Sequence, residues 1–405
     1  MDLKQIRKDS ELIDLFCNLA EIPSPSLHEK RVADYIKNYC DQNKIPCEFD
    51  SYNNVYIHIP ATDNSKQPLM LSSHMDVIGD DSPVETYLDG DLIRAKGRTL
   101  GADDKAGIAN ALYLAKTLAN QDIKHGGLEI MFTRDEESGM SGIKNTDFSK
   151  LKSKYVLVLD SDSLGQLMTS GASYTLATIE VNSFKGGHSG IDIADKTREN
   201  AAKLIADIVA NLPQGVYYSE NHKVVTSCNL GGITSGNPDV TNVINTYGKA
   251  TYSIRSSSRK YEEELKERML FEINDFNNEY AGVAKAKIEF EEHLPPFEKN
   301  DDDYIPILFE AAARKVGVEP EISSFHAGAE THIYANNVNA QGEAFSPYLA
   351  GLAVGYWASK EDVIKNWAID KTFEPKIADE EREKRIKGWN KAVKYAYGWQ
   401  KKIRF

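Results

Sequence analysis

The stretch Pro68-Leu-Met-Leu-Ser-Ser-His74-Met-Asp76 decides how the rest of the chain is interpreted. A short apolar run leads directly into a histidine and, two residues later, an aspartate. Such a run predicts a buried strand, and open α/β sheets place their sites at the carboxyl ends of their strands. Residues two apart on an extended segment point the same way, so the pattern predicts a metal-binding imidazole whose other nitrogen is held by Asp76.

Acidic residues recur downstream at comparable positions. They are Asp103 and Asp104 before a predicted helix over 106–118, Glu136 and Glu137 after a predicted strand over 128–133, and Asp160 after a predicted strand over 155–159. One imidazole and several spaced carboxylates form a ligand set for two adjacent divalent metals, with a carboxylate left over as a general base and acid. Each motif alone also fits a helix cap or an acidic turn. Together they predict a metal-dependent hydrolase.

Length and composition limit the class of protein. A chain of 405 residues exceeds what one hydrophobic core usually supports, so at least two domains are expected. A net charge of -13 disfavours a nucleic-acid partner, because phosphate binding needs a basic surface. No apolar run approaches the roughly 18 to 20 residues of a membrane span, and no signal peptide is recognisable. We therefore expect a cytoplasmic protein without a membrane partner.

A change of pattern near residue 173 predicts a second domain. Before it, strands and helices alternate with polar groups at strand ends, which indicates an α/β sandwich around a largely parallel sheet. After it, alternating strands over 174–181, 249–255 and 285–290 and helices over 197–212 and 261–280 indicate an α+β unit of antiparallel strands. The chain returns with a helix over 305–316 and a charged terminal helix from Ala378. The expected domains are a catalytic domain of 1–173 and 295–405 and an inserted unit of 174–294.

One local signal concerns the amino-terminal region. Ser26 and Glu29 are spaced like a capping box, which predicts that they begin a helix running through Tyr39.

Five motifs in this order resemble the M20 family of dinuclear metallopeptidases, and within it the peptidase T (tripeptidase) and aminoacyl-histidine dipeptidase branches. The motifs are His74-Met-Asp76, Gly101-Ala-Asp103-Asp104-Lys-Ala-Gly107, Asp135-Glu136-Glu137-Ser-Gly139, Asp160 and Gly186-Gly187-His188-Ser189-Gly190. The resemblance covers nearly the whole chain through Val354, including the inserted domain. It implies a zinc-peptidase-like α/β sandwich catalytic domain with an inserted α+β lid or dimerisation domain.

The resemblance also implies the roles of individual residues. His74 and Asp160 would hold one metal, Glu137 the other, and Asp103 would bridge them. Asp76 would orient His74, and Glu136 would be the proton shuttle. The cofactor would be Zn²⁺, Mn²⁺ or Co²⁺, with up to two ions per chain.

Four further residues would lie on the substrate side by the same resemblance. His188 of the lid would approach the scissile carbonyl, commonly from the partner subunit in dimeric members. Arg255 would bind the terminal carboxylate of the peptide, Asn242 would contact the substrate, and His326 belongs to a substrate-side motif. Without the resemblance, His188 and Arg255 would be read as a turn histidine and a surface arginine.

The chain departs from the family at the final metal-ligating histidine. The corresponding loop reads Leu352-Ala-Val-Gly-Tyr-Trp-Ala358-Ser-Lys360-Glu361-Asp362, with Ala358 at the expected position. Glu361 or Asp362 could ligate instead, the second site could be weak or vacant, or only binding could be retained. We expect a weak second site.

The expected function is metal-dependent hydrolysis of the peptide bond of di- or tripeptides, as an aminopeptidase. The alternatives are an N-acyl amino acid deacylase or carboxypeptidase of the same fold, and a catalytically impaired peptide-binding homologue. The expected partners are a small peptide and a second copy of the chain, bound through the lid.

Overall fold

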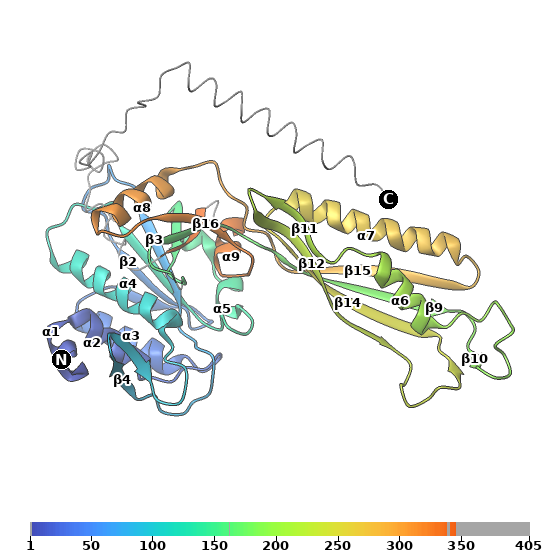
Figure 1. Ribbon diagram of the computed structural model, residues 1–405. Helices are drawn as coiled ribbons and strands as arrows, with labels where there is room; N and C mark the ends of the chain where they lie inside the picture. Colours follow the sequence, from blue (N-terminus) through green and yellow to red (C-terminus); the bar gives the residue numbers. More distant parts are fainter. Residues whose placement is uncertain (1, 162, 338–340, 346–405) are drawn as a thin grey trace, which may run out of the picture. The chain divides into compact units, whose positions relative to one another are not determined.

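The computed structural model describes residues 2–161, 163–337 and 341–345, whose strands form one large mixed sheet, a five-stranded antiparallel sheet and two small strand pairs (Figure 1). The predicted terminal helix from Ala378 and the predicted apolar stretch near Leu349 lie outside the described residues. None of the described helices is long and apolar enough to cross a membrane.

The larger sheet has eight strands in the order β1-β2-β6-β3-β7-β17-β8-β16. The strands are β1 (Cys47–Phe49), β2 (Val55–Ile59), β3 (Leu69–His74), β6 (Leu128–Thr133), β7 (Tyr155–Val158), β8 (Gln166–Gly171), β16 (Glu321–Phe325) and β17 (Gln341–Phe345). Strand β3 runs parallel to both β6 and β7. Every residue of these three strands is buried, as expected for parallel strands that are covered on both faces. The predicted central strands are therefore confirmed.

Alternate side chains of β3 enter two different cores. Leu69 and Leu71 belong to a cluster with residues of four helices: α2 (Glu11–Ala20), α3 (Lys30–Gln42), α4 (Ala102–Asn120) and α8 (Tyr304–Lys315). Met70 belongs to a cluster on the other face with residues of α5 (Ser141–Lys144) and α9 (Thr331–Asn337). Because strand side chains alternate, Ser72 and His74 share the face of Met70. The α/β fold class is thereby confirmed.

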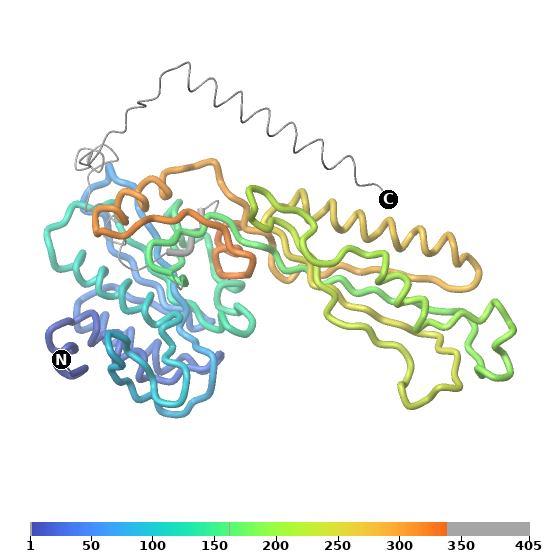
Figure 2. Tube along the Cα trace, in the orientation of Figure 1, coloured from blue at the N-terminus to red at the C-terminus, as the bar shows by residue number. Residues whose placement is uncertain are grey.

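Distant parts of the chain meet in this sheet. Strand β8 pairs in parallel with β16, although Figure 2 draws one green and the other orange. A hairpin of β4 (Thr86–Asp89) and β5 (Leu92–Ala95) and a short helix α1 (Leu3–Asp9) complete the part before β6. The sequence pattern did not predict the hairpin.

The five-stranded sheet is antiparallel and has the order β11-β12-β14-β9-β15. Its strands are β9 (Tyr174–Ser183), β11 (Gly215–Glu220), β12 (Lys223–Ser235), β14 (Tyr247–Ser256) and β15 (Ala284–Leu294). Helices α6 (Ala201–Asn211) and α7 (Arg259–Glu279) share its hydrophobic core. A strand pair of β10 (Gly187–His188) and β13 (Val243–Ile244) lies within the same segment of the chain. The domain bounds 1–173, 174–294 and 295–405 stay a prediction.

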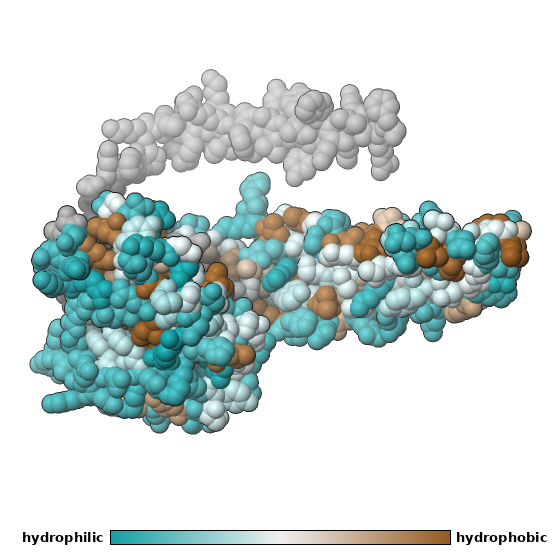
Figure 3. Space-filling view, turned by 90° about the horizontal axis from the view of Figure 1, so that it is seen from below, coloured by the Kyte–Doolittle hydropathy of each residue, from teal (hydrophilic) through white to brown (hydrophobic). Residues whose placement is uncertain are grey.

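The exposed surface is mixed in character. On the face shown in Figure 3, apolar residues drawn in brown lie singly or in small groups among polar ones. Scattered apolar side chains of this kind are normal on a water-exposed face.

The predicted capping box is wrong. Helix α3 begins at Lys30, and Glu29 is its amino-terminal cap residue without a side-chain capping bond. The Ser26 hydroxyl instead donates to Asp76 Oδ2 at 2.7 Å, and Glu29 Oε1 accepts from the Leu27 and Asp135 amides at 2.7 and 3.1 Å. Both side chains bind residues that are distant in the sequence, Ser26 binding Asp76 and Glu29 binding Asp135. Their spacing therefore does not reflect a local helix cap.

A buried polar network ties β9 to helix α7. Glu262 is fully buried and accepts from the Ser173 and Thr175 hydroxyls at 2.9 and 2.7 Å. It also lies 2.8 Å from Lys266 Nζ. We expect Glu262→Ala to lower the free energy of unfolding by about 3 kcal/mol, because buried donors lose their acceptor. Urea unfolding tests this, with the exposed neighbour variant Glu263→Ala expected to change it by no more than about 0.5 kcal/mol. Equal effects of the two variants would contradict the argument.

Candidate active site

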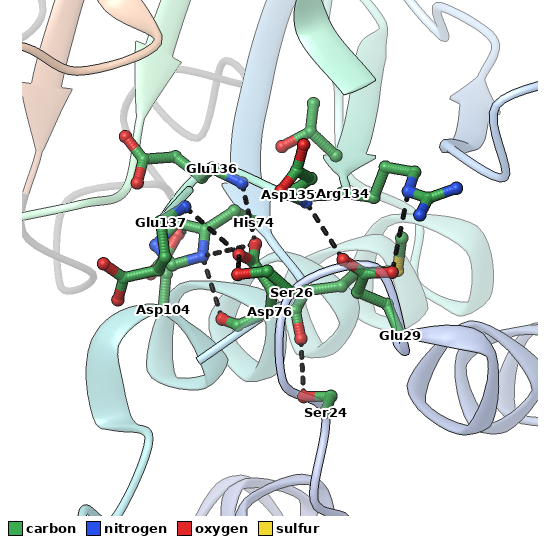
Figure 4. A network of polar contacts seen from close by, with 12 residues as sticks. Ser24, Ser26, Glu29, His74, Asp76, Asp104, Arg134, Asp135, Glu136 and Glu137 are labelled. Atoms are coloured by element: carbon green, nitrogen blue, oxygen red, sulfur yellow. Dashed lines mark hydrogen bonds and ion pairs between the residues drawn. The ribbon is translucent and has the colours of Figure 1, made fainter. Parts of the chain in front are cut away.

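The carboxyl ends of β3 and β6 bring the predicted residues together. His74 is the last residue of β3 and pairs with Thr133, the last residue of β6. The loop after β6 carries Glu136 and Glu137, and Asp103 lies in the first turn of α4. Figure 4 shows Asp76, His74 and the two glutamates gathered in one polar network.

His74 is held from both sides by carboxylates. Its side chain is only 2% exposed, its Nε2 lies 2.8 Å from Asp103 Oδ1, and its Nδ1 lies 3.3 Å from Asp76 Oδ1. Burial alone would lower the pKa of His74, but the hydrogen bonds with Asp103 and Asp76 raise it well above its usual value. A cation at Nε2 would replace the proton that these carboxylates favour.

Asp76 fixes the surrounding loops as well as the imidazole. Its Oδ1 accepts from the Glu136 amide at 2.9 Å, and its Oδ2 accepts from the Glu137 amide at 3.1 Å (Figure 4). Asp76 is fully buried. It therefore sets the position of the backbone from which both glutamates project.

The donor set fits a divalent metal. Ligand atoms of His74, Asp103 and Glu137 all lie within 4.8 Å of one another. The hydrogen bond with His74 lowers the pKa of Asp103 most, and a side-chain hydrogen bond with Asp160 lowers it further, so Asp160 lies next to Asp103. Burial and the charge of Asp103 raise the pKa of Glu137, so these carboxylates repel one another in the absence of a cation. Imidazole and carboxylate donors suit Zn²⁺, Mn²⁺ and Co²⁺.

Glu136 has the environment of a proton carrier. Burial raises its pKa to about 8, His74 opposes the increase, and Glu330 and Asp160 add to it. A carboxyl group with a pKa near the working pH can both take up and release a proton. Among the two glutamates, Glu136 is therefore the one suited to acid and base chemistry.

Sequence reasoning missed the separate duties of two buried acids. The sequence pattern does not distinguish Asp104 from its neighbour Asp103. In the structure Asp104 is buried, and it accepts from the His74 and Gly107 amides at 3.2 Å each. Glu330 is 1% exposed and accepts from the Ser72 hydroxyl at 3.4 Å, and Ser72 lies on the same face of β3 as His74. A buried carboxylate needs such partners. Only its place in the motif His326-Ala-Gly-Ala-Glu330 could have drawn attention to Glu330.

The substrate-side residues form two separate groups. Asn242 Nδ2 lies 3.4 Å from His188 Nε2 in the exposed β10–β13 region. The Arg255 guanidinium lies over the Tyr174 ring, and His326 Nε2 lies 2.6 Å from Ser227 Oγ. Within residues 2–161, 163–337 and 341–345, no hydrogen bond or ion pair joins either group to His74, Asp103 or Glu137. Ala358 and the two residues that could replace the family histidine, Glu361 and Asp362, lie outside the described residues.

His332 is buried as a neutral imidazole beside these groups. Its Nε2 lies 3.1 Å from the Ala172 carbonyl, and its Nδ1 lies 2.9 Å from the Ala329 carbonyl and 3.2 Å from the Ala329 amide, so the ring contacts only neutral backbone groups. Burial lowers the pKa of His332 to about 4 and outweighs the contacts with the Ala329 and Ala172 carbonyls, which favour the protonated ring.

The lowered pKa of His332 makes stability depend on pH. The unfolded imidazole binds a proton below about pH 6.5 and the folded one only near pH 4, so this stabilisation is complete above pH 6.5 and is lost as the pH falls. Between pH 7.5 and 5 the free energy of unfolding should fall by about 2 kcal/mol more in the wild type than in His332→Gln. Urea unfolding at both values tests this, with exposed His222→Gln expected to follow the wild type. Equal pH dependence in wild type and His332→Gln would contradict it.

A sheet that gathers a buried histidine and several carboxylates at the carboxyl ends of parallel strands defines a metallohydrolase-type fold. The sequence profile of peptidase family M20/M25/M40 matches residues 70–353, which is well over half of the chain. The chain therefore belongs to this family, and the predicted family membership is confirmed.

Known proteins of this family resemble the chain in sequence and fold. It is 30% identical over 229 residues to the cytosol non-specific dipeptidase of Escherichia coli, covering 49% of this chain and 46% of that protein, so it spans about half the length of this relative. The crystal structure of aminopeptidase PepT from Bacillus cereus matches with a TM-score of 0.76 at 22% identity, covering 87% of this chain and 98% of that chain. Aminoacylhistidine dipeptidase from Vibrio alginolyticus matches with a TM-score of 0.64 at 20% identity, covering 89% and 97%.

A short stretch of the chain matches a different kind of protein. It is 63% identical over 54 residues to glycerol kinase of Agathobacter rectalis, covering 13% of this chain and 11% of that protein. Glycerol kinase of Clostridium beijerinckii matches at 55% identity over 53 residues.

Proposed function

We propose that the chain is a metal-dependent peptidase that hydrolyses di- or tripeptides with a free amino terminus, in the manner of peptidase T. The observation that carries the proposal is the meeting of ligand atoms of His74, Asp103 and Glu137 within 4.8 Å, beside a glutamate whose pKa is raised to about 8. The printed names of the dipeptidase and of PepT support peptides as the substrate class.

The residues divide the work of hydrolysis. His74, Asp103, Glu137 and Asp160 would hold the divalent metal, which when bound polarises the scissile carbonyl and favours ionisation of water. Asp76 orients the imidazole and the Glu136 backbone. The Glu136 carboxylate takes the proton of the attacking water and then delivers it to the leaving amine nitrogen. In this proposal His188 approaches the carbonyl oxygen, and Asn242 and Arg255 bind the peptide.

Peptides that differ only at their ends test the substrate class. An aminopeptidase should hydrolyse a free tripeptide and reject its N-acetylated form, because the free amine is part of what it recognises. A deacylase or carboxypeptidase of the same fold should accept the acetylated peptide. Binding of the free peptide with no hydrolysis of either, in protein supplied with Zn²⁺ or Mn²⁺, would favour an impaired peptide-binding homologue.

The glycerol kinase match bears on the second metal. Residues before 70 contribute to the core of the large sheet, as Leu19, Ile36 and Ile57 do, so they belong to the body of the peptidase fold. The family profile ends at residue 353, and the PepT structure covers 87% of the chain, whereas the glycerol kinase match covers 13%. We infer that the glycerol kinase-like stretch is the carboxyl-terminal one. A glycerol kinase-like sequence at the carboxyl terminus would explain why Ala358 stands at the position of the family histidine. It supports one firm metal site and a weak second site.

The remaining assignments are proposals of the same standing. A cytoplasmic location is supported by the name of the Escherichia coli relative. A homodimer through the lid of residues 174–294 is supported by the sheet edges β11 and β15, since edge strands can pair with another chain. Size-exclusion chromatography with light scattering would test the dimer.

A further inference from the structure

Ser26 and Glu29 reach two loops of the candidate active site from one short segment, residues 22–29, which joins α2 to α3. The Ser26 hydroxyl donates at 2.7 Å to Asp76 Oδ2, in the loop after β3. The buried Glu29 carboxylate accepts at 3.1 Å from the Asp135 amide, in the loop after β6. All four residues belong to one polar network (Figure 4). The segment therefore connects the two loops that follow the central strands.

Three successive backbone amides in the loop after β6 are bound by buried carboxylates. Glu29 Oε1 accepts from the Asp135 amide at 3.1 Å. Asp76 accepts from the next two amides, those of Glu136 and Glu137, at 2.9 and 3.1 Å. Asp135 has a φ of 59°, a left-handed conformation that is uncommon for a residue other than glycine and needs support from its surroundings. Glu29 and Asp76 together supply this support.

The segment is itself fixed beside the loop after β3. The buried Ser24 hydroxyl donates to the Met75 carbonyl at 2.8 Å. The Ser24 carbonyl accepts from the Val77 amide at 2.9 Å. These two contacts hold the backbone on either side of Asp76, so the Ser26 hydroxyl approaches the Asp76 carboxylate from a fixed direction.

We propose that Ser26 and Glu29 are positioning residues of the metal site, which hold the loops after β3 and β6 so that His74 and Glu137 can bind one cation. The proposal rests on the peptidase function above and extends it with two side chains that are not among the proposed ligands. Without the Ser26 hydroxyl, Asp76 loses a hydrogen bond that fixes its carboxylate beside the imidazole. Without the Glu29 carboxylate, the loop that carries Glu137 loses an acceptor for its first amide.

The dissociation constant for Zn²⁺, measured by competition with a chromophoric chelator, tests these roles. Loss of a partner of a metal ligand typically costs 10- to 100-fold in affinity. Ser26→Ala and Glu29→Ala should therefore each weaken binding by about tenfold, at the lower end, because both act through other residues. Ser26→Thr retains a hydroxyl and Glu29→Gln retains an acceptor oxygen, so both should recover most of the affinity. The absorption spectrum of bound Co²⁺, which reports ligand geometry, should change in Ser26→Ala and return in Ser26→Thr.

Ser10→Ala is the matched control. The Ser10 hydroxyl is a helix cap, which accepts from the Ile13 amide at 3.3 Å at the start of α2. This variant should lower the free energy of unfolding but bind Zn²⁺ as the wild type does. An equal loss of affinity in Ser10→Ala would contradict the positioning roles, as would unchanged affinity in Ser26→Ala and Glu29→Ala. If Glu29→Ala does not fold, the half-buried Ser26 decides the test.

The same measurements separate this proposal from the proposed function. Wild-type protein that binds no Zn²⁺ overturns both. Wild-type protein that binds Zn²⁺ and hydrolyses no peptide overturns the peptidase function alone, because neither the affinity nor the Co²⁺ spectrum depends on a substrate.

Discussion

Glu136→Gln is expected to lower kcat for peptide hydrolysis by about 10²- to 10⁴-fold while the bound metal per chain stays unchanged. The amide keeps the size of the side chain but cannot take up a proton from water. The backbone of residue 136 stays in place, because its amide still donates to Asp76 Oδ1 at 2.9 Å. Steady-state kinetics and elemental analysis of the same preparation measure the two quantities.

A surface control makes the Glu136 result specific. Glu48 is exposed on the edge strand β1, so Glu48→Gln removes a carboxylate far from this chemistry and should leave kcat within a factor of about two. Substantial residual turnover in Glu136→Gln would show that another group moves the proton. Loss of metal together with activity would instead place Glu136 among the ligands.

Asp103→Asn is the second change with a large expected effect, and it acts on metal affinity. Asp103 Oδ1 lies 2.8 Å from His74 Nε2, at the centre of the donor set, and its side chain is 67% exposed so that a cation can reach it. Changes to partners of metal ligands typically cost 10- to 100-fold in affinity, so loss of a ligand charge should cost about 100-fold or more. Competition with a chromophoric chelator measures the dissociation constant for Zn²⁺ in each protein.

Asp122→Asn provides the matched control, since Asp122 is an exposed aspartate beyond helix α4. It should bind Zn²⁺ as the wild type does. Chelation of wild-type protein should abolish hydrolysis, and Zn²⁺, Mn²⁺ or Co²⁺ should restore it. An Asp103→Asn protein with unchanged Zn²⁺ affinity would remove this residue from the metal site.

The central part of the fold could be predicted because its signals are local. The run before His74 is apolar throughout, and the structure buries all six residues of β3 since both faces of the sheet are covered. A strand that ends in a histidine then puts this residue at the sheet edge where sites form. The same reasoning places Glu136 and Glu137 after β6, which the structure confirms.

Contacts between distant residues were beyond local reasoning. Ser26 and Glu29 have the spacing of a capping box. In the structure the Ser26 hydroxyl instead binds Asp76, and the Glu29 carboxylate binds the Asp135 amide. Ser72 and Glu330 meet across 258 positions, so nothing near either residue predicts the contact. Asp103 and Asp104 have distinct roles because the fold buries Asp104 and leaves Asp103 exposed. Two adjacent aspartates in a sequence do not reveal which of them will be buried.

The cause of the missing family histidine could not be predicted from the carboxyl-terminal sequence. The absent histidine could be seen in the sequence, but its cause could not, because a single sequence does not show where one kind of protein gives way to another. Our inference that the 54-residue match to glycerol kinase is the carboxyl-terminal stretch would explain the absence, and no spacing of residues could have suggested it. Under the same inference, we favour a weak second site over replacement ligation by Glu361 or Asp362.

His74 and the carboxylates around it should bind a divalent cation. Crystals of the full chain grown with excess Mn²⁺ or Zn²⁺ test it through anomalous scattering at the metal edge. We expect an anomalous peak bonded to His74 Nε2 and Asp103, with Glu137 or Asp160 completing the ligand set. A well-ordered site without such a peak, with His74 still hydrogen-bonded to Asp103, would contradict it.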